Sequence, residues 1–136
     1  MKLLPVIALA AATLLPCAAQ AYNGAELLAD CRAAEETFDG KQDSDPTHAI
    51  RSTRCISYLS GFADSYAVSD YLASQVGIKL NAFCLPHDPE LARRLVRAVV
   101  IHVERIPPQS TTSTATLVAG ALSKAFPCPE TLEPKK

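Results

Sequence analysis

The sequence predicts an all-α protein, a small bundle of four main helices stapled by two disulfides. Three observations favour this fold class. Leucine and alanine recur at three- and four-residue steps, whereas alternating β-branched runs are scarce. Proline, glycine and Ser/Thr clusters separate these helical stretches. Four of the five cysteines lie beyond an N-terminal apolar leader, which is typical of an exported protein with paired cysteines.

Residues 1–21 have the pattern of a cleaved secretory signal peptide. Lys2 provides a positive start, an apolar run covers residues 3–15, and Ala19-Gln20-Ala21 has the small-x-small form of a cleavage site. The run is too short to cross a bilayer core of about 30 Å, and no later apolar segment is longer. We expect cleavage after Ala21 and a periplasmic location.

Cys17 lies within this leader and follows Pro16. A lipoprotein would carry a small residue before its lipidated cysteine. We therefore expect Cys17 to leave with the leader.

The mature chain has the size of one domain. Removing 21 of the 136 residues leaves 115, and we expect a domain over 22–130 with a flexible tail over 131–136. Lys2 leaves with the leader, so the net charge changes from −1 to −2. A chain of this charge offers no broad basic field for nucleic acid.

The first two helices are expected over residues 23–36 and about 47–74, with a polar loop over 39–47 between them. Each carries apolar residues at helical spacing. In the first helix these are Leu27, Leu28, Cys31 and Ala34; in the second they are Ile50, Cys55, Tyr58, Leu59, Phe62 and Tyr66.

Two glycines mark special positions around the second helix. Gly61 lies inside it, where a glycine costs about 1 kcal/mol relative to alanine. We interpret it as a point of close approach by another helix. Gly77 is expected to stop the helix.

The last two helices are bounded by proline and Ser/Thr signals. Asp88-Pro89-Glu90 predicts a helix start, with Asp88 as N-cap, and Pro107-Pro108 the end of that helix near Ile106. The Ser/Thr-rich turn 110–114 supplies the next N-cap. The fourth helix then stops at Phe126-Pro127-Cys128.

Four cysteines allow three pairings, and their spacing selects none. If the first two helices are antiparallel, Cys31 late in the first lies near Cys55 early in the second. An antiparallel third and fourth helix likewise brings Cys84 to Cys128. We therefore predict the pairs Cys31–Cys55 and Cys84–Cys128.

Signals for metal, cofactor and catalysis are weak. Cys84-x-x-His87 has ligand spacing, and His48 or His102 could add a ligand. Zinc binds reduced thiolates, however, and the cysteines of an exported protein are oxidised to disulfides. The phosphate-loop, Gly-x-Ser-x-Gly and His-Glu-x-x-His motifs are absent. We predict no cofactor and no enzyme activity.

Asp64 and Asp70 are six residues apart on the second helix and share no face well, so we do not interpret them as catalytic carboxylates. Asp64 is instead expected to hydrogen-bond a neighbouring helix. His48 is expected to face solvent near a helix start, and His102 to be partly buried.

Four segments with cysteines, aromatic residues or prolines at fixed spacing follow one another along the mature chain. They are Leu27-Leu28-x-x-Cys31, Cys55-x-x-Tyr58-Leu59-x-Gly61-x-x-Asp64, Phe83-Cys84-Leu85-Pro86, and Ala121-Leu122-x-x-Ala125-Phe126-Pro127-Cys128. In this order they cover nearly the whole mature chain and resemble the Rap/Tai family of type VI secretion immunity proteins.

This resemblance implies a small all-helical periplasmic protein that binds and blocks a peptidoglycan-cleaving amidase delivered by a neighbouring cell. Some members act as dimers, so a homodimer is one state that the resemblance allows. It also implies that the shared residues belong to the scaffold rather than to the toxin contact. Besides the cysteines, these are Tyr58, Gly61, Asp64, Pro86 and Pro127.

The candidate partner contact is the exposed face of the third helix around Arg93, Arg94 and Arg97, with the loops 75–81 and 109–114. The alternative for these arginines is an ordinary solvated face. The alternative function is a periplasmic stress or chaperone-like protein with no toxin partner, which would expose hydrophobic surface.

Overall fold

The structure is a computed structural model that describes residues 22–41, 44–106 and 112–129. Four helices form it: α2 (Gly24–Phe38), α3 (Pro46–Ser74), α4 (Leu91–Arg105) and α5 (Thr114–Ala125). The predicted all-α class with four helices is confirmed. The predicted leader 1–21, the tail 131–136 and Pro107-Pro108 lie outside the described residues.

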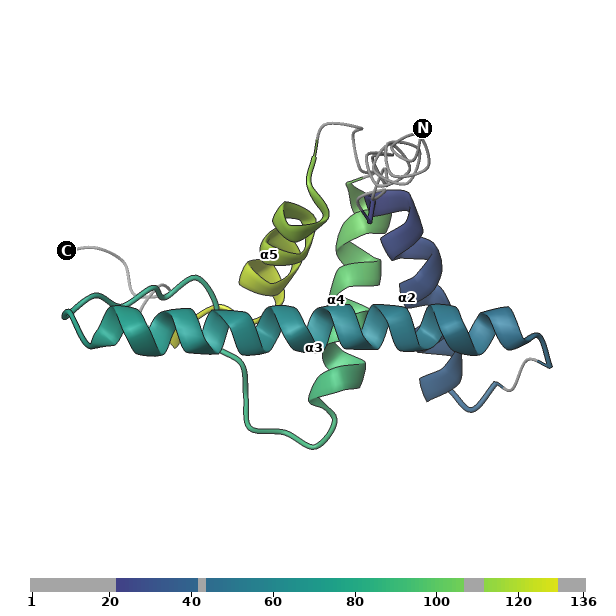
Figure 1. Ribbon diagram of the computed structural model, residues 1–136, viewed down its shortest axis with the longest axis horizontal. Coiled ribbons are helices and arrows are strands. Elements are labelled where there is room, and N and C mark those ends of the chain that lie inside the picture. The colour runs from purple at the N-terminus through teal and green to yellow at the C-terminus, as the bar shows by residue number, and fades with distance from the viewer. Residues whose placement is uncertain (1–21, 42–43, 107–111, 130–136) are drawn as a thin grey trace, which may run out of the picture.

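Helices α2, α4 and α5 stand side by side with α4 in the middle, and α3 runs across them (Figure 1). The central α4 contributes Leu95, Val96, Val99, Val100 and Val103 to the core. Leu27 from α2, Leu59 from α3, and Val118 and Leu122 from α5 close around it.

The helix starts follow from capping residues. The Asn23 side chain accepts hydrogen bonds from the first turn of α2, and Glu26 bonds back to the Asn23 N–H, which completes a capping box. Asp45 caps α3, whose first residue is Pro46, and Ser113 caps α5.

The start of α4 is shifted from its predicted position, whereas the end of α3 agrees with the prediction. Asp88 was expected to cap α4 directly, but its carboxylate accepts from the Glu90 N–H at 2.9 Å and forms a turn, so the helix begins at Leu91. Gly77 ends α3 as expected. It takes a left-handed φ of 77°, which lets the Ile78 N–H return to the Ala73 carbonyl at 3.0 Å.

The two predicted disulfides, Cys31–Cys55 and Cys84–Cys128, are both present, with Cα–Cα distances of 5.1 and 4.9 Å. The expected antiparallel packing of the first two helices is wrong, because α3 crosses α2 steeply (Figure 1). The first disulfide therefore links α2 and α3 at the point where they cross. The second joins the loop before α4 to the end of α5, where the Cys84 N–H also bonds the Phe126 carbonyl at 2.8 Å.

An ion pair between a buried carboxylate and a half-exposed arginine lies directly beside the first disulfide. Asp30 precedes Cys31 and is 1% exposed, and Arg54 precedes Cys55. The guanidinium Nε and Nη2 of Arg54 donate to the two carboxylate oxygens at 2.6 and 3.1 Å, and the Tyr22 hydroxyl donates at 2.8 Å. Burial, and then the hydrogen bond to Asp30, raise the pKa of Tyr22 well above its usual range.

Two predictions about the second helix are wrong. A Cβ at Gly61 would meet no atom within 4 Å, so no helix approaches closely there. Asp64 is exposed and makes no hydrogen bond to the other described residues. Both residues are exposed.

Removing either disulfide by paired Cys→Ser substitution should destabilise the protein strongly. Loops of 24 and 44 residues correspond to about 3.5 and 4 kcal/mol of chain entropy in the unfolded state. Urea unfolding of the two double variants checks this. A loss below about 1 kcal/mol would contradict the role given to these bonds.

Replacing Gly61 by alanine should stabilise the protein, because the position is exposed, helical and sterically open. The expected gain is about 0.5 to 1 kcal/mol. Gly120→Ala is the matched comparison, since its Cβ would lie 3.2 Å from the His102 ring and the ring would have to shift. Thermal unfolding should therefore show a larger gain for Gly61→Ala than for Gly120→Ala; a destabilised Gly61→Ala variant would contradict the open site.

Candidate interaction surfaces

The end of α3 carries a concentrated apolar surface. Nine large hydrophobic side chains are exposed among the described residues, and six of them belong to the last turns of α3 and the loop that follows. We call this surface the α3 tip; it consists of Val68, Tyr71, Leu72, Val76, Ile78 and Leu80, which are 40–72% exposed.

The α3 tip projects because α3 is longer than the layer it crosses. Its 29 residues extend over about 44 Å, whereas three helices packed side by side at about 8–10 Å between axes are roughly 30 Å wide. The buried residues of α3 end at Ala63. Figure 1 shows the remaining turns extending beyond α5, so their apolar side chains have no helix to pack against.

The loop beside the α3 tip is fixed by hydrogen bonds. Asp70 accepts from the Leu80 N–H at 3.1 Å, and the Tyr66 hydroxyl accepts from the Ala82 N–H at 2.9 Å. The Tyr66 ring stacks on buried Phe83 with 3.9 Å between centroids. The backbone of this loop is therefore tied to α3.

A groove of about 680 Å³ follows α3 at this end, between the helix and residues 83–91. Asp64, Asp70 and Pro86 are among the residues that line it. Asp64 and Asp70 thus border one groove although they are six residues apart. Pro86, expected to be part of the scaffold, is half-buried in its wall.

The predicted arginine face is only partly available. Arg93 donates to the Phe38 carbonyl at 2.5 Å and pairs with Glu90, so it ties α4 to the end of α2. Arg94 pairs with Asp88 at 2.8 Å and lies over the Phe126 ring. Arg97 is exposed and has no ion pair among the described residues.

The other predicted contact segments and scaffold residues have different positions. Loop 75–81 contains Val76, Ile78 and Leu80 of the α3 tip. Residues 109–111 lie outside the described ranges. Tyr58 is half-buried against the Tyr22 ring at 5.2 Å, edge to face. Pro127 follows Phe126, the C-cap residue of α5, and is exposed.

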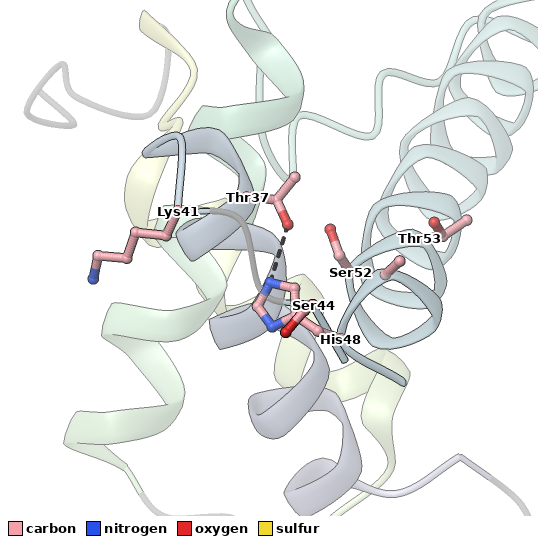
Figure 2. A pocket seen from close by; sticks show the side chains of 7 residues that line it. Thr37, Lys41, Ser44, His48, Ser52 and Thr53 are labelled. Atoms are coloured by element: carbon pink, nitrogen blue, oxygen red, sulfur yellow. Dashed lines mark hydrogen bonds between the residues drawn. The ribbon is translucent and has the colours of Figure 1, made fainter. Parts of the chain in front are cut away.

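A polar pocket lies between the end of α2 and the start of α3 (Figure 2). His48 points into it and is half-buried, contrary to the solvent-facing position expected. Its Nε2 lies 3.3 Å from the Thr37 hydroxyl, which itself donates to the Ala33 carbonyl at 2.9 Å. Because that hydroxyl proton is engaged, His48 must be the donor and does not activate Thr37 as a nucleophile.

A second, apolar groove runs between α4 and α5, and His102 lies in it. The half-buried ring packs against Gly120, as the prediction of partial burial requires. Burial and then the nearby Lys124 lower the pKa of His102. The imidazole is therefore neutral at pH 7.

Within the part of the chain that the structure describes, no three His, Cys, Asp or Glu side chains are grouped so as to hold a metal ion. No helix within it has both the length and the apolar character needed to cross a membrane.

Comparison with known proteins adds the family. The model of the Rap1a immunity proteins matches residues 23–128, which include all four helices and both disulfides. Searches of curated proteins and of solved structures found no match. Since the family model covers most of the 136 residues and agrees with the resemblance found in the sequence, the chain belongs to the Rap1a immunity protein family.

Proposed function

We propose that this protein is exported to the periplasm, where it binds and inhibits a peptidoglycan amidase delivered by type VI secretion, and so protects the producing cell. The protein acts by docking and catalyses no reaction itself. Membership of the Rap1a immunity protein family supports the immunity role. The leader pattern of residues 1–21 and the two disulfides support export to an oxidising compartment.

The observation that carries this proposal is the α3 tip. Contiguous exposed apolar surface on a small exported protein marks a site of protein contact. The tip is held by the Asp70 and Tyr66 hydrogen bonds, so a partner that docks there orders few side chains and little affinity is lost to entropy. The assigned occupant is the amidase.

Two other partners could occupy the same surface. A second copy of the chain would bury it in a homodimer, as the resemblance to dimeric immunity proteins allows. An unfolded client would use it if the protein were chaperone-like. A folded amidase differs from both, because it forms a complex of fixed stoichiometry that blocks peptidoglycan hydrolysis.

Substitutions in the α3 tip should abolish inhibition without unfolding the protein. Leu72→Asp and Val76→Asp change side chains that are 59% and 72% exposed, so folding should be unaffected. Burying a carboxylate at the interface should weaken binding by about 100-fold or more. The measurements are calorimetric affinity for purified type VI amidases, including any encoded beside this gene, and hydrolysis of peptidoglycan.

Ile50→Asp is the matched control, because Ile50 is 63% exposed but lies in the first turns of α3. It should leave affinity and inhibition unchanged. Wild-type protein that is folded yet binds and inhibits none of the amidases would refute the proposal. Sedimentation of the free protein separates the homodimer, and suppression of aggregation of an unfolded client separates the chaperone-like role.

A further inference from the structure

The groove between α4 and α5 lies apart from the α3 tip. Its volume is about 200 Å³, and small side chains, Ala98, Ala121 and Ala125, leave the hollow between the helices. Ile101 and Ile106 border it and are 40% and 52% exposed. The groove is thus a furrow with an apolar lining that the bundle itself leaves uncovered.

Positive charge surrounds this apolar furrow. Arg105 and Lys124 line it, one from each helix. Arg97 lies on the same side of α4, because residues 97, 101 and 105 are spaced four apart and follow one face of the helix. All three side chains are exposed.

Apart from Arg51, the other arginines of the described residues pair with a carboxylate, whereas these three cations do not. Arg32 pairs with Glu104, Arg54 with Asp30, and Arg94 with Asp88. By contrast, Arg97, Arg105 and Lys124 have no carboxylate partner among the described residues. Glu104, the acidic residue next to Arg105, is already engaged by Arg32 at 3.0 Å.

We propose that the α4–α5 groove is a second docking surface that binds an acidic amphipathic helix of a partner protein. The apolar ridge of that helix packs into the furrow between Ile101 and Ile106, in the way that a third helix packs between two others. Its carboxylates pair with Arg105, Lys124 and Arg97. A concave furrow fits such a ridge, whereas a membrane surface is flat.

The test uses the mature, disulfide-bonded protein and a synthetic amphipathic peptide with leucine at helical spacing and glutamate at the remaining positions. Methyl NMR spectra should show shifts at Ile101 and Ile106, and fluorescence anisotropy should give the affinity. A peptide with glutamine in place of glutamate should bind at least fivefold more weakly, because it keeps the apolar ridge but loses the charge pairs.

Neutralising the groove should have the same effect. The double variant Arg105→Gln and Lys124→Gln should lose about fivefold or more in affinity for the glutamate peptide. Arg51→Gln is the matched control, since Arg51 is an exposed arginine at the far end of α3 and has no ion pair among the described residues. If the double variant fails to fold, the wild-type affinity should still fall as salt is raised.

Three outcomes would overturn the inference. The first is the absence of shifts at Ile101 and Ile106. The second is equal affinity for the glutamate and glutamine peptides. The third is that anionic phospholipid vesicles, or a second copy of the protein at high concentration, shift these methyl groups while the peptide does not. None of these outcomes depends on whether an amidase binds the α3 tip.

Discussion

The crossing of α3 over α2 is the constraint on which the rest of the structure depends. Two links made by consecutive residues hold it: Asp30–Arg54 and Cys31–Cys55. The disulfide fixes where the helices meet. The bidentate ion pair restrains rotation about that point, because the planar guanidinium bonds both carboxylate oxygens. Since Asp30 is buried, its charge is acceptable only in this arrangement.

The crossing point also explains why so much apolar surface stays outside. It lies about ten residues from the start of α3, and the layer of α2, α4 and α5 covers the helix only as far as Ala63. A helix of 29 residues, about 44 Å long and fixed near its start, must extend past a layer that is three helices wide. The position of one disulfide therefore determines that the α3 tip projects.

Much of the fold could be predicted from local signals. The Ser/Thr turn supplies the cap of α5 through Ser113, and apolar spacing identified most of the buried faces, although Ile50 on the predicted face of α3 is 63% exposed. The cysteine pairs were correct although the antiparallel packing behind one of them was not, because a crossing also brings Cys31 to Cys55. Spacing within a helix gives no crossing angle, so the overhang of α3 and the openness around Gly61 could not be predicted. Asp30 did leave a signal, since it falls on the same helical face as Leu27, Cys31 and Ala34.

The two disulfides compensate for the apolar residues that stay outside the core. A chain of 136 residues has a limited core, and apolar side chains left in solvent add nothing to it. Loops closed by Cys31–Cys55 and Cys84–Cys128 destabilise the unfolded state instead, which leaves apolar residues free to serve contacts with partners. The arginines show the same division: Arg54 and Arg94 stabilise the fold, whereas Arg97 and Arg105 remain available beside an apolar groove. The residues that stabilise the scaffold therefore differ from the exposed apolar and cationic residues of the α3 tip and the α4–α5 groove.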